Sequence, residues 1–351
     1  MSNQTESDYY KQLTIYKAGV LIWKVVPPVF ILLGTIGNCL SILVLTRRSI
    51  RVSTTALFLT VLACSDLLVL YSGLLRQWLI YLYNTDVRHI SEAGCKIHTW
   101  LVYSSLDFSA WIIIILTLER VISSWLPHRA KTMCTNKTAV FILIAVCVFI
   151  LVKNSHFLYG LVFEIANEKT NQVEQKCVAI DQNYSHFEYE VQPWIDMCVY
   201  CIVPFAIILI GNVSILFKVL QSQKKTKSTV APSQSSRSRG QQQGIRHAKQ
   251  SSTTAILFTL SIVFLVTTSP VSIYLIVETY WIQDADDAKL AKLDFWWAVV
   301  NMLMYSKNSV NFLLYCLSGT KFKKEFFRLI NWKKSARLNN FNMQSNNSTR
   351  T

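Results

Sequence analysis

Charged side chains are scarce in this sequence. They make up 16% of the 351 residues, while hydrophobic residues make up 52%. Soluble domains carry about 25% charged residues. The charge is missing chiefly from blocks of roughly 20 residues, which is the length a helix needs to cross a bilayer. The composition therefore excludes an ordinary soluble domain and favours a membrane protein.

Glycine and metal-binding patterns are also sparse. The 10 glycines are spread singly, so no glycine loop is present to cradle a phosphate, and no nucleophile motif or metal-ligand spacing is evident. These absences predict that the chain is not an enzyme and needs no metal or cofactor. No internal repeat is evident either, which disfavours a transporter built from repeated halves.

Seven apolar blocks follow one another along the chain, and they predict an all-α membrane protein with a seven-transmembrane helix bundle. The blocks are 27–45, 56–75, 100–118, 139–152 with a continuation to 163, 197–220, 255–277 and 295–317. We expect an outer tail at 1–26, the bundle at 27–318, a disordered loop at 221–250, an amphipathic surface helix at 319–332 and an inner tail at 333–351.

The distribution of basic residues predicts the orientation. The net charge is +15, and most lysines and arginines fall in the loops that are cytoplasmic if the N-terminus is extracellular. Most acidic residues fall on the other side. The positive charge is thus interpreted as a topology signal in the plasma membrane, and nucleic acid is not expected as a partner.

Two cysteines, Cys95 and Cys177, lie on the predicted outer side, where oxidation is permitted. They leave one pairing, which would join the third span to the loop after the fourth. Asn3 and Asn183 begin glycosylation sequons on the same side.

Ionisable groups within the spans are rare, and each is by default functional or paired. Asp66 lies near the middle of the second span and Lys307 lies in the seventh. Asp107 in the third span and Lys153 in the fourth offer a second candidate pair within the membrane. Asn38, in the first span, also requires a hydrogen-bond partner.

Short motifs occur once per span and in a fixed order. They are Gly37-Asn38, Leu62 to Asp66, Cys95 with Cys177, Glu119-Arg120, Pro204, Phe264 with Pro270, and Asn311 to Tyr315. Together they resemble a class A (rhodopsin-like) G-protein-coupled receptor over about residues 27–332. The segments after spans four and seven are most similar to invertebrate-type neuropeptide receptors, such as those for FMRFamide and myosuppressin.

This resemblance implies roles for particular residues. Arg120, restrained by Glu119, would dock on a heterotrimeric G protein, and the switch would involve Asn212, Phe264, Pro270, Asn311 and Tyr315. Asp66 would bind sodium with Ser109 and the seventh-span asparagines, including Asn308. Lys307 either pairs with Asp66 and displaces the sodium or turns to another polar cavity. The family's sixth-span tryptophan is replaced by Thr268, its seventh-span proline by Phe312, and its fifth-span tyrosine by Asn212.

The resemblance also implies a ligand pocket between the outer halves of the helices. Its candidate residues are Gln77, Val102, Tyr103, His156, Tyr274, Glu278, Trp297 and Asn301. Apolar Val102 stands where amine receptors carry an aspartate, and the acidic outer surface favours a basic ligand. We therefore expect an extracellular peptide ligand, with a small non-peptide ligand as the alternative. Arrestin, recruited by phosphorylated Ser and Thr in 222–254 and 335–351, is a further candidate partner, as is membrane lipid.

An opsin and a transporter or channel are the two other classes of membrane protein that the sequence disfavours. An opsin would carry its retinal lysine at the position of Tyr305, and Lys307 lies about 200° further around the helix. A transporter or channel would need polar residues continuous through the bundle, whereas the charges here cluster mainly at the helix ends.

Overall fold

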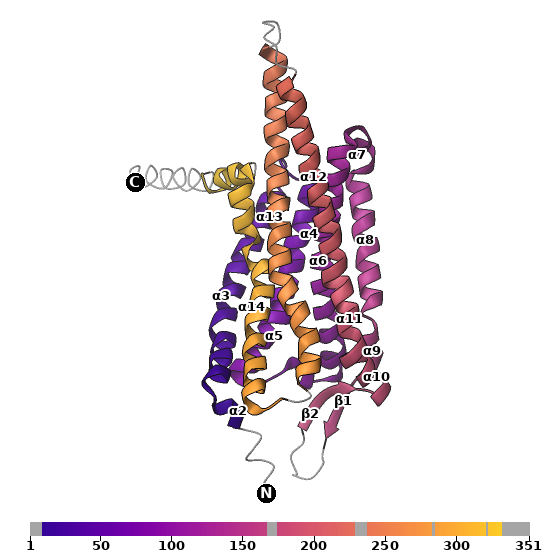
Figure 1. The fold of residues 1–351 in the computed structure, drawn as a ribbon, viewed down its shortest axis with the longest axis vertical. Coiled ribbons are helices and arrows are strands. Elements are labelled where there is room, and N and C mark those ends of the chain that lie inside the picture. Colours follow the sequence, from indigo (N-terminus) through magenta and orange to yellow (C-terminus); the bar gives the residue numbers. More distant parts are fainter. Residues whose placement is uncertain (1–8, 167–173, 229–236, 283–284, 321, 332–351) are drawn as a thin grey trace, which may run out of the picture.

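The computed structural model describes residues 9–166, 174–228, 237–282, 285–320 and 322–331. Its long helices run up and down roughly one axis and form a bundle (Figure 1). The first four helical runs are α3 (Thr14–Leu45); α4 (Thr54–Val69) with η1 (Leu70–Leu74) and α5 (Leu75–Tyr83); η3 (Gly94–His98) with α6 (Thr99–Trp125); and α8 (Asn136–Lys153).

The remaining long runs complete the bundle. They are α10 (Gln182–His186), η4 (Phe187–Val191), α11 (Gln192–Asp196), η5 (Met197–Ile202) and α12 (Val203–Ser228) in succession; α13 (Arg237–Trp281); and α14 (Asp287–Ser318). Shorter helices are α2 (Tyr9–Gln12), η2 (Val87–His89), α7 (Pro127–Met133) and α9 (His156–Gly160). The strands β1 (Leu161–Ala166) and β2 (Glu174–Ala179) form an antiparallel hairpin.

Within the described residues, six helical runs are long and apolar enough to cross a membrane. The seventh, α14, carries Lys307 and several asparagines that make it less apolar, yet it packs extensively against α3 and α13. The predicted all-α fold with its seven-helix bundle is therefore confirmed. The polar residues of α14 face protein, which is where polar groups are tolerated at membrane depth.

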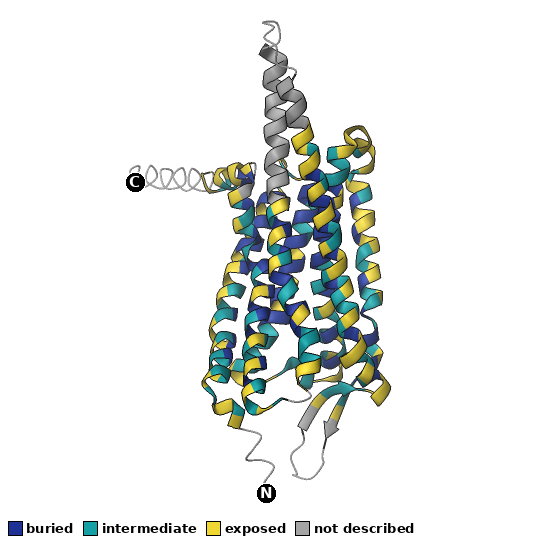
Figure 2. Cartoon of the chain, in the orientation of Figure 1, coloured by how far each residue is buried: buried dark blue, intermediate teal, exposed yellow. Residues whose placement is uncertain are grey.

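Burial follows the pattern expected for helices in lipid. The inward faces of the helices are buried, while their outward faces are exposed (Figure 2). The outward faces are apolar, as illustrated by Phe141 and Ile210, whose exposed fractions are 72% and 69%. Such side chains would be costly in water, and they suit the hydrocarbon of a bilayer.

A hairpin and a disulfide close one end of the bundle. Cys95 in η3 and Cys177 in β2 form the disulfide, with their Cα atoms 5.4 Å apart, so that this predicted pairing is confirmed. Phe163 of β1 lies opposite Cys177 in the strand register. We call this the disulfide end and the opposite end of α6 the Arg120 end.

Several predicted boundaries differ from the structure. The outer tail was expected to reach residue 26, but α3 begins at Thr14 because Trp23 is fully buried and Gly19 packs against the backbone of α14. The fourth span was expected to continue to residue 163, but the chain enters β1 at Leu161. The fifth helical run begins at Gln182, well before the predicted Met197.

The predicted disordered loop at 221–250 also differs from the structure. α12 continues to Ser228 and α13 begins at Arg237, while residues 229–236 lie outside the described part. Lysine, glutamine and arginine are good helix formers, and extending an existing helix requires no new nucleation. After α14, residues 322–331 form a helix whose Phe322 and Phe326 pack on Phe312. The tail at 333–351 lies outside the described residues.

The contact between α3 and α14 depends on small residues. A Cβ atom added at Gly37 would lie 2.9 Å from the Cβ of Phe312, which cannot move without its backbone. We expect Gly37→Val to reduce the free energy of unfolding by about 1–3 kcal/mol, because the two helices must separate. The midpoint of thermal unfolding in lipid nanodiscs measures this change. Ile36→Val, on the exposed face of the same helix, is the control, and an equal loss in both variants would contradict the expectation.

Candidate functional site

A buried carboxylate lies at the centre of the bundle. Asp66, on α4, is 1% exposed. Its Oδ1 accepts hydrogen bonds from Ser109 Oγ at 3.1 Å and from Asn308 Nδ2 at 2.7 Å. Its Oδ2 accepts one from Asn311 Nδ2 at 2.5 Å. The backbone carbonyl of Asn308 in turn accepts a hydrogen bond from Asn38 Nδ2 at 2.8 Å, so that the predicted polar core residues are brought together.

Lys307 joins this network indirectly. Its Nζ donates to Ser109 Oγ at 3.4 Å, and the structure gives no ion pair between Lys307 and Asp66. The direct pairing considered above is therefore replaced by a bridge through Ser109, because the asparagines of α14 already occupy the carboxylate. The ammonium also lies 5.7 Å from the ring centroid of Phe264, a cation–π distance.

A buried ammonium lies close to Asp66. Three neutral side chains direct hydrogen-bond donors at the carboxylate, while the Oδ1 atoms of Asn38 and Asn308 are buried without a hydrogen-bond partner. A buried lysine ammonium, 3% exposed, lies one hydroxyl away and would repel a cation. That Lys307 supplies the positive charge that a sodium ion would otherwise bring stays a prediction.

Glu119 and Arg120 both contact the hydroxyl of the same threonine, Thr55. Glu119 accepts hydrogen bonds from the hydroxyls of Thr54 and Thr55, and Arg120 Nη2 contacts the same Thr55 hydroxyl. Glu119 was expected to restrain Arg120 directly. In the structure the two are connected through α4, because adjacent residues on a helix point in different directions.

Most of the other predicted switch residues are buried in the bundle. Phe264 is 1% exposed and packs edge-on against Tyr200 of η5, with centroids 6.3 Å apart. Tyr315 is 1% exposed and packs on Phe322. Asn212 is 9% exposed on α12, and Pro270 lies inside α13. Their part in switching stays a prediction.

Some predicted pocket residues form a group between α13 and α14. The Tyr274 hydroxyl lies 3.1 Å from Glu278 Oε1 and 3.0 Å from the Leu293 carbonyl oxygen. The rings of Tyr274 and Trp297 lie 5.6 Å apart. Asn301 instead donates to the Trp297 carbonyl on its own helix.

The remaining pocket candidates lie on other helices. His156 is buried and its Nδ1 lies 2.9 Å from the Tyr184 hydroxyl, so that it belongs to an aromatic cluster under the hairpin. Tyr103 packs on Phe157 of that cluster at 4.5 Å. Gln77 and Val102 are half-buried. A cavity of 460 Å³ opens at the disulfide end, lined by residues of the hairpin, of α10 and of η4, including Glu188, and by Arg88 of η2.

An ionic cluster fixes the loop at the disulfide end. Arg76 donates to both Asp86 oxygens, at 2.9 and 2.8 Å, and Arg88 donates to Oδ2 at 3.0 and 2.9 Å. Burial alone would raise the pKa of Asp86, but the hydrogen bonds from the two guanidinium groups hold the pKa well below its usual value. Asp86 is therefore ionised throughout the physiological range and connects Arg76 of α5 to Arg88 of η2.

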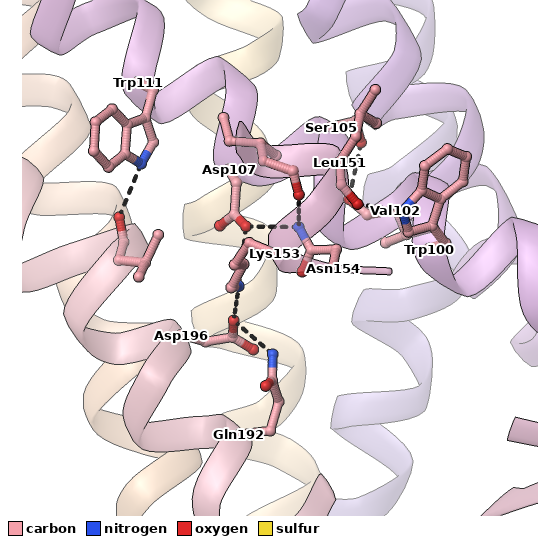
Figure 3. A network of polar contacts seen from close by, with 12 residues as sticks. Trp100, Val102, Ser105, Asp107, Trp111, Leu151, Lys153, Asn154, Gln192 and Asp196 are labelled. Carbon is pink, nitrogen blue, oxygen red and sulfur yellow. Dashed lines mark hydrogen bonds and ion pairs between the residues drawn. The ribbon is translucent and has the colours of Figure 1, made fainter. Parts of the chain in front are cut away.

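Three charged side chains meet between α6, α8 and α11 (Figure 3). Lys153 Nζ lies 3.1 Å from Asp107 Oδ2 and 2.5 Å from Asp196 Oδ1. The expected pair of Asp107 and Lys153 is therefore present. Asp196 was missed because the fifth span was predicted to begin one residue later, which placed this carboxylate outside the membrane. The aspartate in QPWIDM directly before an apolar run was the available signal.

Comparison with known proteins supports this architecture. Residues 37–315 match the family described as 7 transmembrane receptor (rhodopsin family). The chain belongs to this family. As a family member, the receptor is a multi-pass membrane protein, and the match disfavours a transporter or channel.

The receptor's relatives are distant. It is 25% identical to the thyrotropin-releasing hormone receptor of Bos taurus over 350 residues, covering 95% of this chain and 85% of the relative. It is 28% identical to the C-C chemokine receptor type 1 of Macaca fascicularis over 199 residues, covering 54% and 51%. It is 23% identical to the FMRFamide receptor of Drosophila melanogaster over 311 residues, covering 84% and 51%. The receptor thus spans about half the length of the last two.

The position of Lys307 predicts how the receptor responds to sodium. We expect the unfolding midpoint of the wild-type receptor to be the same in sodium chloride and in N-methylglucamine chloride of equal ionic strength. Lys307→Ala removes the competing charge, so that a sodium-dependent rise in the midpoint is expected in this variant only. Lys292→Ala, on the exposed surface of α14, is the control. Sodium stabilisation of the wild-type receptor would contradict the assignment.

Proposed function

We propose that this receptor binds an extracellular peptide and activates heterotrimeric G proteins through the cytoplasmic ends of α6, α12 and α13. The observation that carries the proposal is the buried Glu119–Thr55–Arg120 cluster at one end of a bundle whose opposite end holds a cavity. The cavity at the disulfide end would bind the ligand, and Arg120 at the opposite end would be released to contact the G protein.

The cavity and the charged groups at the disulfide end support a peptide as the ligand. The 460 Å³ cavity is bordered by the hairpin and carries charged groups of both signs, including Arg88, Asp181 and Glu188. Three of the relatives are named for a peptide hormone, for chemokines and for FMRFamide, which supports a peptide ligand. Their names differ, so they do not identify which peptide binds. We propose no narrower class from these distant matches.

The proposed orientation places the disulfide end outside the cell and the C-terminus in the cytoplasm. The disulfide requires an oxidising compartment, and the basic loops favour the cytoplasmic side. The helix at 322–331 would then lie on the inner leaflet, with Phe322 and Phe326 toward the bundle. The serines and threonines proposed for arrestin recruitment lie largely outside the described residues and side chains.

Arg120 provides the test of signalling. A library of neuropeptides is applied to cells that express the full chain, with calcium and cAMP as readouts. We expect at least one peptide to activate the receptor, and Arg120→Ala to reduce the maximal response about tenfold or more without abolishing surface expression. Arg129→Ala, in the exposed helix α7, is the control. Failure of every peptide, or a full response in Arg120→Ala, would refute the proposal.

Asn183 tests the orientation. Its side chain is exposed on α10 at the disulfide end, so that glycan attachment is sterically open there. We expect Asn183→Gln to increase the electrophoretic mobility of the receptor by the mass of one glycan, and glycosidase treatment to remove the difference. Asn346→Gln, at a sequon predicted to be cytoplasmic, should leave the mobility unchanged. The opposite pattern would invert the topology. Asn3, in the other outer sequon, lies outside the described residues.

A further inference from the structure

The cluster of Asp107, Lys153 and Asp196, here called the acid–lysine triad, carries an unbalanced charge. Two carboxylates share one ammonium, so that the ionised triad has a net charge of −1. Its side chains are 5%, 11% and 16% exposed in that order. An uncompensated charge in the apolar interior of a membrane protein is costly and is retained chiefly where it has a function.

Hydrogen-bond acceptors also exceed donors at the triad. Asn154 is 0% exposed, and its Nδ2 donates to Asp107 Oδ2 at 2.9 Å and to the Ile150 carbonyl at 3.2 Å. The Oδ1 atom of the same amide is buried without a hydrogen-bond partner. A buried acceptor left unsatisfied costs about 1–3 kcal/mol. A group that brings both positive charge and N–H donors would satisfy the ionised triad and Asn154 together.

The triad and the cavity at the disulfide end are connected by one helical run. Asp196, the most exposed member of the triad, ends α11, which continues directly from η4. Glu188 of η4 lines the cavity, about 12 Å further along the same run, whereas the triad residues do not line it. Gln192, one turn from Asp196 toward the cavity, donates to its Oδ1 at 3.0 Å. A ligand held at Glu188 would therefore have to extend about 12 Å deeper into the bundle to reach Asp196.

We propose that the acid–lysine triad is a binding site for a guanidinium group of the receptor's ligand. The planar guanidinium would bind the Asp196 carboxylate and donate to Asn154 Oδ1, while Lys153 keeps its bond to Asp107. A guanidinium suits this site better than an ammonium, because it has five donors in a fixed plane and is more weakly hydrated. The assignment rests on the proposed receptor function and names the ligand chemistry that it would select.

The test uses a matched pair of small probes on the full-length receptor in lipid nanodiscs. N-acetyl-arginine amide carries the guanidinium, and N-acetyl-citrulline amide has the same shape without the charge. At roughly millimolar concentration, we expect the arginine probe alone to raise the unfolding midpoint. Asp196→Asn should weaken its apparent affinity about tenfold or more, since a charge-assisted pair is lost, whereas Asp196→Glu should retain part of it.

Controls separate this assignment from general charge effects. Glu92→Gln removes an equal charge from an exposed helix-end residue and should leave the arginine probe's affinity unchanged. Equal effects of both probes on the wild-type receptor, or no effect of either, would overturn the assignment whether or not the Asp196 variants fold. Undiminished binding in a folded Asp196→Asn variant would overturn it as well.

Failure of the guanidinium site can be distinguished from failure of the proposed receptor function. A peptide that activates the receptor with equal potency in wild type and Asp196→Asn would refute the guanidinium site while leaving the receptor function intact. Conversely, probe binding that depends on Asp196 in a chain that no peptide activates would support the site and refute peptide signalling.

Discussion

Every polar group inside this bundle must find a partner within the protein, because hydrocarbon outside the bundle offers none. Asp66 shows the consequence most clearly. One carboxylate on α4 receives donors from α6 and α14, and Asn308 extends the network to α3. Four helices are thereby held at one depth by a single buried charge. The close approach of α3 to α14 at Gly37 permits the last of these contacts.

An aromatic pair separates the Asp66 network from the acid–lysine triad. Lys307 lies over the ring of Phe264, and Tyr200 of η5 packs edge-on against that ring. Tyr200 follows Asp196 by one helical turn on the same run. A change at Asp196 that shifts this turn would therefore alter the packing of Phe264 and the surroundings of Lys307. The physical link is contiguous packing of buried side chains, which repack between discrete arrangements.

Much of the fold could be predicted from the sequence because lipid imposes strong constraints on composition and length. The apolar blocks, the disulfide and the ionic partner of Lys153 all follow from local rules of hydrophobicity and charge. The ends of the helices could not be predicted in this way. Thr14 begins α3 because Trp23 and Gly19 find tertiary partners, and propensity alone contains no information about such contacts.

The candidate sites likewise include features that the sequence predicted and features that it could not. Sequence spacing placed Lys307 on the face of α14 that carries Asn311, but it did not show that asparagine donors would occupy Asp66 and leave Ser109 as the bridge. Asp196 was missed because a carboxylate at a span boundary has two interpretations that only the neighbouring helices distinguish. Glu119 was predicted to restrain Arg120 directly, but the hydroxyl that both contact belongs to Thr55 on another helix.

Two departures from the family's motifs fall on α13 and α14, which pack against each other. Thr268 replaces a large tryptophan on α13, and the Lys307 side chain lies against Phe264, one turn away on that helix. Phe312 replaces the seventh-span proline and fills the space between Gly37 and the rings of Phe322 and Phe326. Lys307 and Phe312 thus each add a side-chain contact that joins α14 to a neighbouring element.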